Sequence, residues 1–350
     1  MFARTTAPPA IDPDRLAHPR LAECVALHPP QGEAGSWIIQ RGESRYFRVT
    51  PDVARLAAEF DGERDHQQLA LALGAPWRTA DVGTVVTKLA GTGMLDDGSG
   101  FSRKRTPRIR LAPPLTVQLS LLHPGKTLAV LKPLVGRAMS GAGLVTLAAL
   151  AVAGLLSLVL QLGALRLALT SPQPFLTYVL IFAGILLTTG IHEVAHGAVL
   201  TYYGGRPSRL GVMLFYLSPA FFCDVSDGWR LGVKADRVRV ALAGIAVQIV
   251  VASMAAVLAL SLPGSAVKAG LLLFAAATYL AAAFNLVPFI KLDGYIALMS
   301  HLDVSHLRQR AMVDGRRALA RALFGGRYRR ELPDLPWSSW YGLACMGFPI

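Results

Sequence analysis

The chain has 350 residues, of which 53% are hydrophobic and only 16% charged, and its mean hydropathy is +0.44. This composition argues against an ordinary water-soluble protein. The formal net charge of +13 is unevenly divided, since residues 1–100 carry −3 and residues 101–350 carry +16. Three widely spaced cysteines without a CxxC pair argue against a disulfide framework or a thiolate zinc site. We therefore expect two parts of different physical character.

The acidic first part predicts a small module behind a flexible N-terminus at residues 1–32. Short apolar runs at 37–39 and 46–49 favour a β-hairpin. Thr50, followed by proline, predicts the start of a helix that ends near residue 60. Further helices are expected near 64–73 and 80–91. Residues 33–100 should therefore form an α+β domain.

A hairpin combined with helices resembles a winged helix, and the order and spacing are similar to those of PqqD-like domains. These domains bind leader peptides of ribosomally made, post-translationally modified peptides. The resemblance implies that a leader peptide adds as a strand to the hairpin edge. The alternative is a structural cap without a ligand. The local charge of −3 argues against DNA binding.

Four apolar runs follow a basic linker and in-plane segment at residues 101–140. A helix needs about 20 apolar residues to cross a bilayer core of about 30 Å. The runs near 142–165, 175–203, 240–262 and 269–290 reach this length. We expect a multi-pass α-helical membrane protein with about four transmembrane helices, a partial fifth as an alternative, and a small N-terminal α+β winged-helix-like cytoplasmic domain.

Lysine and arginine residues alternate in number between the connecting segments. The segment before the first run carries eight, 166–174 one, 204–239 six, 263–268 one and 291–330 nine. The positive-inside rule therefore predicts a cell-membrane protein whose N-terminal module and active site face the cytoplasm. Every basic cluster adjoins an apolar run, so we expect anionic lipids as partners and no nucleic acid.

His192, Glu193 and His196 form an H-E-x-x-H pattern inside the second apolar run. On a helix, imidazoles at i and i+4 share one face and can bind one zinc ion. Glu193 lies one step further round and can accept a proton from metal-bound water. The alternative is a pair of packing histidines beside a stray carboxylate. An ionised carboxylate inside an apolar span is costly unless it is neutralised, which favours the metal site.

Asp293 is the candidate for the third protein ligand that a catalytic zinc ion requires. Pro288 breaks the fourth apolar run, and Gly294 permits a turn directly after Asp293. His192 lies about 26 Å along its helix from Phe175, near the cytoplasmic end. Asp293 also lies at the cytoplasmic end of its own apolar run, so it is expected at the same depth in the membrane as His192. The alternative is a solvated helix cap at the membrane surface.

HEVAH followed by Asn285-x-x-Pro288-x-x-x-Leu292-Asp293-Gly294 resembles the site-2 protease family of intramembrane zinc metalloproteases. The likeness runs through most of residues 111–310. It implies that one catalytic Zn²⁺ ion is bound by His192, His196 and Asp293. It also implies that Glu193 is the general base and that Asn285 helps to hold the substrate or the oxyanion.

Gly204-Gly205 and the segments at 216–219 and 224–229 resemble those of a subgroup of this family, the peptide zinc metalloproteases. Members of the family usually continue into further spans. Here residues 304–350 are an Arg-rich cytoplasmic tail with a C-terminal apolar segment, for which a partial fifth helix and an interfacial segment are the alternatives.

Residues 141–303 are thus expected to be a membrane-embedded zinc metalloprotease core that acts on a peptide or transmembrane peptide substrate. The preferred function is leader removal from a modified-peptide precursor, with modified-peptide biosynthesis enzymes as further candidate partners. The alternatives are cleavage of a membrane-bound transcription regulator and a non-catalytic export or immunity protein. The uncharged stretch at 210–223, broken by Pro219, is either a re-entrant element that holds the substrate or a membrane-surface hairpin.

Overall fold

The computed structural model describes residues 12–30, 37–42, 45–96, 98, 109–112, 116–122, 124–215 and 218–348. Parts of the predicted flexible N-terminus (1–11 and 31–32), of the basic segment at 101–140 (101–108, 113–115 and 123) and of the segment at 216–219 (216–217) lie outside these residues. The chain divides into two compact units. Unit 1 joins Met1–His123 with Gly205–Val233, and unit 2 joins Pro124–Gly204 with Lys234–Ile350.

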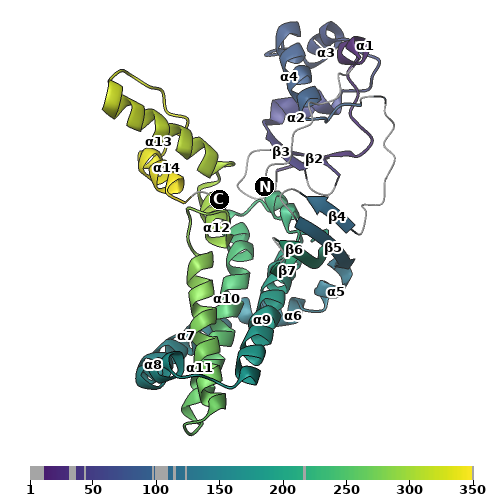
Figure 1. The fold of residues 1–350 in the computed structure, drawn as a ribbon. Coiled ribbons are helices and arrows are strands. Elements are labelled where there is room, and N and C mark those ends of the chain that lie inside the picture. Colours follow the sequence, from purple (N-terminus) through teal and green to yellow (C-terminus); the bar gives the residue numbers. More distant parts are fainter. Residues whose placement is uncertain are drawn as a thin grey trace. The chain divides into compact units, whose positions relative to one another are not determined.

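A small antiparallel sheet of three strands lies in the N-terminal part of unit 1 (Figure 1). Its strands are β1 (Val25–His28), β2 (Trp37–Arg41) and β3 (Arg45–Val49), in the order β1-β2-β3. The register of β2 with β3 confirms the predicted hairpin. The described residues 12–30, expected to be flexible, instead contain helix α1 (Pro13–Ala17) and strand β1. The reason is that β1 pairs along β2 and places Leu27 against the core.

Three short helices complete this part of unit 1, at the predicted positions. They are α2 (Pro51–Ala58), α3 (His66–Leu73) and α4 (Thr79–Gly91). Thr50 caps α2 by accepting a hydrogen bond from the Val53 amide, and Asp65 forms a capping box with Gln68 at α3. The helices and β2 enclose one apolar core whose fully buried members include Ile39, Leu56, Leu69, Val82, Val86, Met94 and Leu95.

A second antiparallel sheet in unit 1 contains the stretch at 210–223. Its strands, in order, are β4 (Ile109–Ala112), β5 (Thr116–Leu122), β6 (Leu210–Phe215) and β7 (Ser218–Cys223). The stretch is therefore a hairpin, and the sequence does not predict that β5 extends it. Pro219 is tolerated because β7 is an edge strand, where a missing amide hydrogen costs no ladder bond. The short 3-10 helix η1 (Ser226–Arg230) follows.

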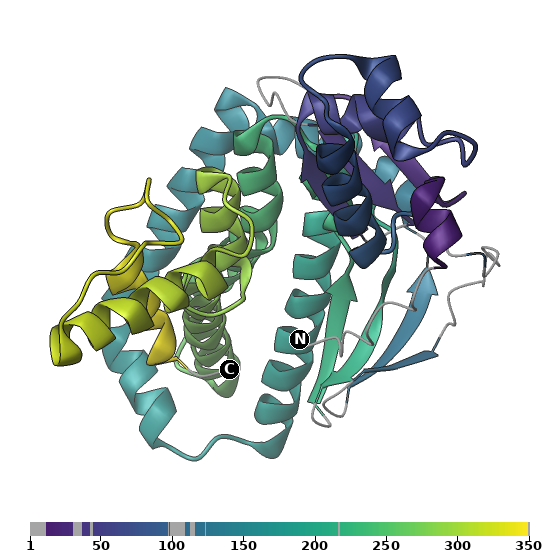
Figure 2. The same cartoon turned by 90° about the horizontal axis from the view of Figure 1, so that it is seen from above.

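Unit 2 is helical in its described part (Figures 1 and 2). Its helices are α5 (Gly125–Ala129), α6 (Lys132–Met139), α7 (Gly141–Leu160), α8 (Leu162–Thr170), α9 (Phe175–Tyr202), α10 (Lys234–Leu260), α11 (Ala266–Asn285), α12 (Asp293–Leu302), α13 (Leu307–Phe324) and α14 (Ser338–Met346). Among the described residues, α7, α9, α10 and α11 are long and apolar enough to cross a membrane. They match the four predicted runs, although the first ends at Leu160, where Gln161 separates α7 from α8.

Helix α10 is the centre of this unit, because it packs against α7, α9, α11 and α12. The most apolar part of α10 is 56% buried, compared with 11 to 22% for the other three long helices. Those three expose large apolar side chains, among them Leu156, Phe182 and Leu280. The arrangement leaves α10 in contact with both helices that carry the candidate site, α9 and α12.

Candidate metal centre

His192 and His196 lie one helical turn apart on α9 and face the same side of the helix. Both are buried, each with 5% of its surface exposed. Their Nε2 atoms are 3.1 Å apart. Glu193 follows His192 on the helix and is half-buried. The two imidazoles therefore present their ring nitrogens to one common point.

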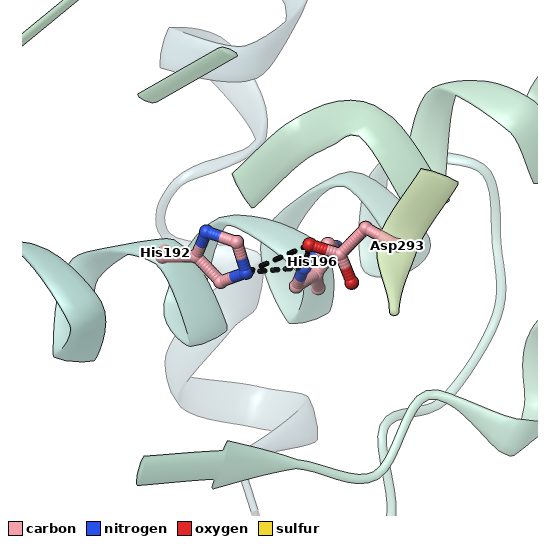
Figure 3. Close-up of side chains that lie close together, drawn as sticks. All are labelled: His192, His196 and Asp293. Atoms are coloured by element: carbon pink, nitrogen blue, oxygen red, sulfur yellow. Dashed lines mark hydrogen bonds and ion pairs between the residues drawn. The ribbon is translucent and has the colours of Figure 1, made fainter. Parts of the chain in front are cut away.

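Asp293 is the first residue of α12 and directs its carboxylate at the same point (Figure 3). Its Oδ2 atom lies 3.0 Å from Nε2 of His192 and 3.4 Å from Nε2 of His196. At the amino end of a helix, the helix dipole favours the ionised carboxylate. The structure thus brings together the three residues that the sequence proposes as ligands.

Gly294 makes this position of Asp293 sterically accessible. A Cβ atom on Gly294 would lie 2.2 Å from the carbonyl oxygen of Leu286, which is far inside van der Waals contact. Only glycine therefore lets the first turn of α12 approach the end of α11 so closely. The far end of α12 is held by an ion pair of 2.5 Å between Arg237 on α10 and Asp303.

The three side chains fit a tetrahedral metal ion. Among the described residues, they form the one group whose ligand atoms all lie within 4.8 Å of one another. Bonds of about 2.1 Å in a tetrahedral zinc site place neighbouring ligand atoms roughly 3.4 Å apart, close to the observed separations. Oδ2 of Asp293 is buried without a well-directed hydrogen bond to a described residue. Two imidazoles and one carboxylate suit a divalent ion such as zinc.

Helix α10 contacts both histidines and helps to fix the orientation of their rings. Nδ1 of His196 donates a hydrogen bond of 2.7 Å to the carbonyl oxygen of Val240. That bond leaves Nε2 without a hydrogen and free to bind a metal. One turn further, a Cβ atom on Gly244 would lie 2.5 Å from Cε1 of His192. The absence of a side chain at Gly244 therefore provides the space that the His192 ring occupies.

Asn285 is held by the next turn of the same face of α10. Its Nδ2 atom donates a hydrogen bond of 3.2 Å to Oε1 of Gln248, which is buried. Val240, Gly244 and Gln248 are spaced four residues apart and share one side of the helix. The structure therefore connects Asn285 to the face of α10 that contacts His192 and His196, outside the group of three ligand atoms.

No sequence motif marks Val240, Gly244 or Gln248 as part of the site. Gln248 carries a usable signal, because it is an amide side chain in the middle of a run that is otherwise apolar apart from two serines. Gly244 lies among other small residues and carries no such signal. Val240 contributes a backbone carbonyl, which is independent of its side chain.

Compared with protein-family models, curated proteins and solved structures, the chain gives no match. The functional assignment therefore depends on the geometry of the site and on the sequence motifs.

Proposed function

We propose that this protein is an intramembrane zinc metalloendopeptidase of the site-2 protease type. The observation that carries the proposal is the buried group of His192, His196 and Asp293, whose ligand atoms lie within 4.8 Å of one another. The two histidines belong to an H-E-x-x-H pattern on a helix, the arrangement that zinc peptidases use. A carboxylate supplied by a second helix completes a set of three protein ligands, as in catalytic zinc sites.

The four long apolar helices are proposed to span the cell membrane. Their exposed Leu, Val and Phe side chains would be covered by lipid. The alternating Lys and Arg content of the connections supports an orientation with the N-terminal module and the active site towards the cytoplasm. Anionic lipids are the proposed partners of the basic segments, including α13 with its several arginines.

In the proposed reaction, Glu193 accepts a proton from the attacking water and then delivers it to the leaving amine. A zinc ion held by the three ligands would supply Lewis acidity, which makes water nucleophilic near neutral pH and polarises the scissile carbonyl. Asn285 would donate its amide hydrogen to the substrate or to the oxyanion. The scissile segment must be unwound, since a helical carbonyl is already engaged in a hydrogen bond.

The N-terminal part of unit 1 is proposed to be a PqqD-like, winged-helix-like module that recruits the substrate. Its three-stranded sheet with packed helices supports this assignment, and an outer strand of the sheet offers backbone groups for a leader peptide. The proposed substrate is a modified-peptide precursor from which the leader is removed. Enzymes of modified-peptide biosynthesis are proposed as further partners.

Mass spectrometry of candidate precursor peptides, co-expressed with the wild type or with Glu193→Gln, tests this function. The wild type should contain zinc and cleave one peptide, while Glu193→Gln should contain zinc without cleaving. Glu331→Gln, an equally conservative change at an exposed carboxylate, is the matched control and should cleave normally. Full activity of Glu193→Gln would exclude the proposed base. A zinc-containing wild type that cleaves no precursor would favour a non-catalytic export or immunity protein.

A further inference from the structure

Asp293 directly follows a short connection between α11 and α12, residues 286–292, so the path of this connection sets the position of Asp293. The connection has few hydrogen bonds of its own, such as that from the Leu292 amide to the Ile290 carbonyl. Two successive carbonyls instead accept hydrogen bonds from the C-terminal helices. Tyr341 Oη on α14 donates to the carbonyl of Pro288 at 2.6 Å, and Arg308 Nε on α13 donates to that of Phe289 at 3.0 Å.

Arg308 is buried, and its guanidinium donates hydrogen bonds to several backbone carbonyls. Besides Phe289, its guanidinium donates to the carbonyls of Cys345 at 3.1 Å and Phe348 at 2.8 Å. A buried guanidinium is costly unless its several N–H groups are engaged. Here the planar fork joins the 286–292 connection to the end of α14, which a lysine with its single ammonium cannot reproduce.

Aromatic packing strengthens the same junction. The ring of Phe289 lies 5.7 Å from that of Tyr341 and stacks on that of Phe348 at 5.6 Å, centroid to centroid. Tyr295 on α12 accepts a hydrogen bond of 3.3 Å from the Arg308 amide. The C-terminal helices therefore hold both the connection before Asp293 and the helix that begins with it.

The two C-terminal helices pack together as a rigid pair that can hold the 286–292 connection in place. They lie side by side in both views (Figures 1 and 2). Asp314 on α13 is fully buried and accepts hydrogen bonds from the amides of Glu331 and Leu332 and from the hydroxyl of Ser338. These bonds secure the chain between α13 and α14, so the hairpin resists deformation.

We infer that the α13–α14 hairpin is a clamp that sets the position of Asp293, and that Arg308 and Tyr341 are positioning residues for the metal site. The inference rests on the proposed function in one respect, namely that Asp293 binds a metal. It assigns the C-terminal tail a role beyond membrane anchoring. Neither residue touches the ligand atoms, so both act through the 286–292 connection.

Titration of the purified full-length protein with Co²⁺, followed by its visible absorption, tests the clamp. Tyr341→Phe and Arg308→Lys should each weaken Co²⁺ binding about tenfold or more and alter the absorption bands. The reason is that each loses a hydrogen bond to the 286–292 connection, so that Asp293 is held less firmly at the metal. Tyr328→Phe is the matched control, since the Tyr328 hydroxyl contacts Ser339 inside the hairpin. Arg316→Lys, at an exposed position of α13, controls for Arg308.

Thermal unfolding of each variant separates positioning from folding. Tyr341→Phe removes a single oxygen atom, so it decides the outcome even if Arg308→Lys does not fold. Wild-type affinity and absorption in a folded Tyr341→Phe variant would overturn the clamp. A wild type that binds Co²⁺ but cleaves no peptide, with weakened binding in the two variants, supports the clamp and removes only the proposed protease function. A wild type that does not bind Co²⁺ overturns both.

Discussion

The imidazole of His196 donates its Nδ1 hydrogen to the carbonyl oxygen of Val240, 2.7 Å away on the neighbouring helix α10. The bond selects the tautomer whose Nε2 carries a lone pair, and it turns that atom towards Asp293. Packing of α10 on α9 therefore prepares the ring for metal binding. The same packing provides the space for His192 beside Gly244.

Gly244→Ala should impair metal binding. The added Cβ atom would lie 2.5 Å from Cε1 of His192, so the ring must move away from the other two ligands. We expect metal affinity to fall by about 10- to 100-fold, measured by competition with a chromogenic chelator. Gly163→Ala on α8 is the control, because nothing lies within 4 Å of its added Cβ atom. Equal affinities in the two variants would show that the contact with Gly244 is unimportant.

Asn285→Ala should retain the metal and lose turnover. Asn285 lies outside the three-ligand group and contacts Gln248, so its removal spares the ligands. If the amide stabilises an oxyanion, kcat should fall by roughly 100- to 1,000-fold. Peptide cleavage and zinc content measured on the same samples check this. Unchanged kcat would assign Asn285 a purely structural role beside α10.

The proposed orientation places the turn between α10 and α11 on the side of the membrane opposite the cytoplasm. A cysteine introduced by Gly264→Cys should react with an impermeant maleimide in right-side-out vesicles, since an added Cβ atom there meets no atom within 4 Å. The wild type, with Cys24, Cys223 and Cys345, is the control and should react only after permeabilisation. Labelling of the intact wild type, with no additional labelling in Gly264→Cys, would reverse the orientation.

The base of the β6–β7 hairpin should weaken in acid. Burial alone would raise the pKa of Asp224, but hydrogen bonds from Ser208 and Ser226 and the charge of Arg209 lower the pKa below its usual value. Both serine hydroxyls donate at 2.6 Å. Because the folded-state pKa is depressed, the ionised carboxylate stabilises the fold above the unfolded-state pKa of about 3.9. This stabilisation is lost as the pH falls through the folded-state pKa.

Hydrogen-exchange protection factors of the β6 and β7 amides measure this effect. They should decline at acidic pH in the wild type, whereas Asp224→Asn should have low protection already at neutral pH and little further decline. Asp334→Asn, at an exposed position, should behave as the wild type does. Identical profiles for the wild type and Asp224→Asn would contradict the assigned role of the carboxylate.

Local patterns in the sequence were sufficient to predict several features of this protein. Hydropathy and length locate the four long helices, because these properties belong to single stretches of chain. The spacing of His192 and His196 places them on one helical face for the same reason. Asp293 follows from the small number of acidic residues near the ends of the apolar runs. Capping residues such as Thr50 mark the short helices of the N-terminal module.

Contacts between residues distant in sequence decided the rest. Strand β5 joins the 210–223 hairpin by pairing with β6, and no local sequence pattern predicts this pairing. Val240 serves His196 through a carbonyl that every residue possesses, across 44 positions of the chain. Arg308 and Tyr341 reach the connection before Asp293 from the C-terminal hairpin. The sequence by itself determined which groups are available for a metal site. Tertiary packing decided what holds them at bonding distance, because contacts with backbone carbonyls and close approaches between helices exist only once the helices are assembled.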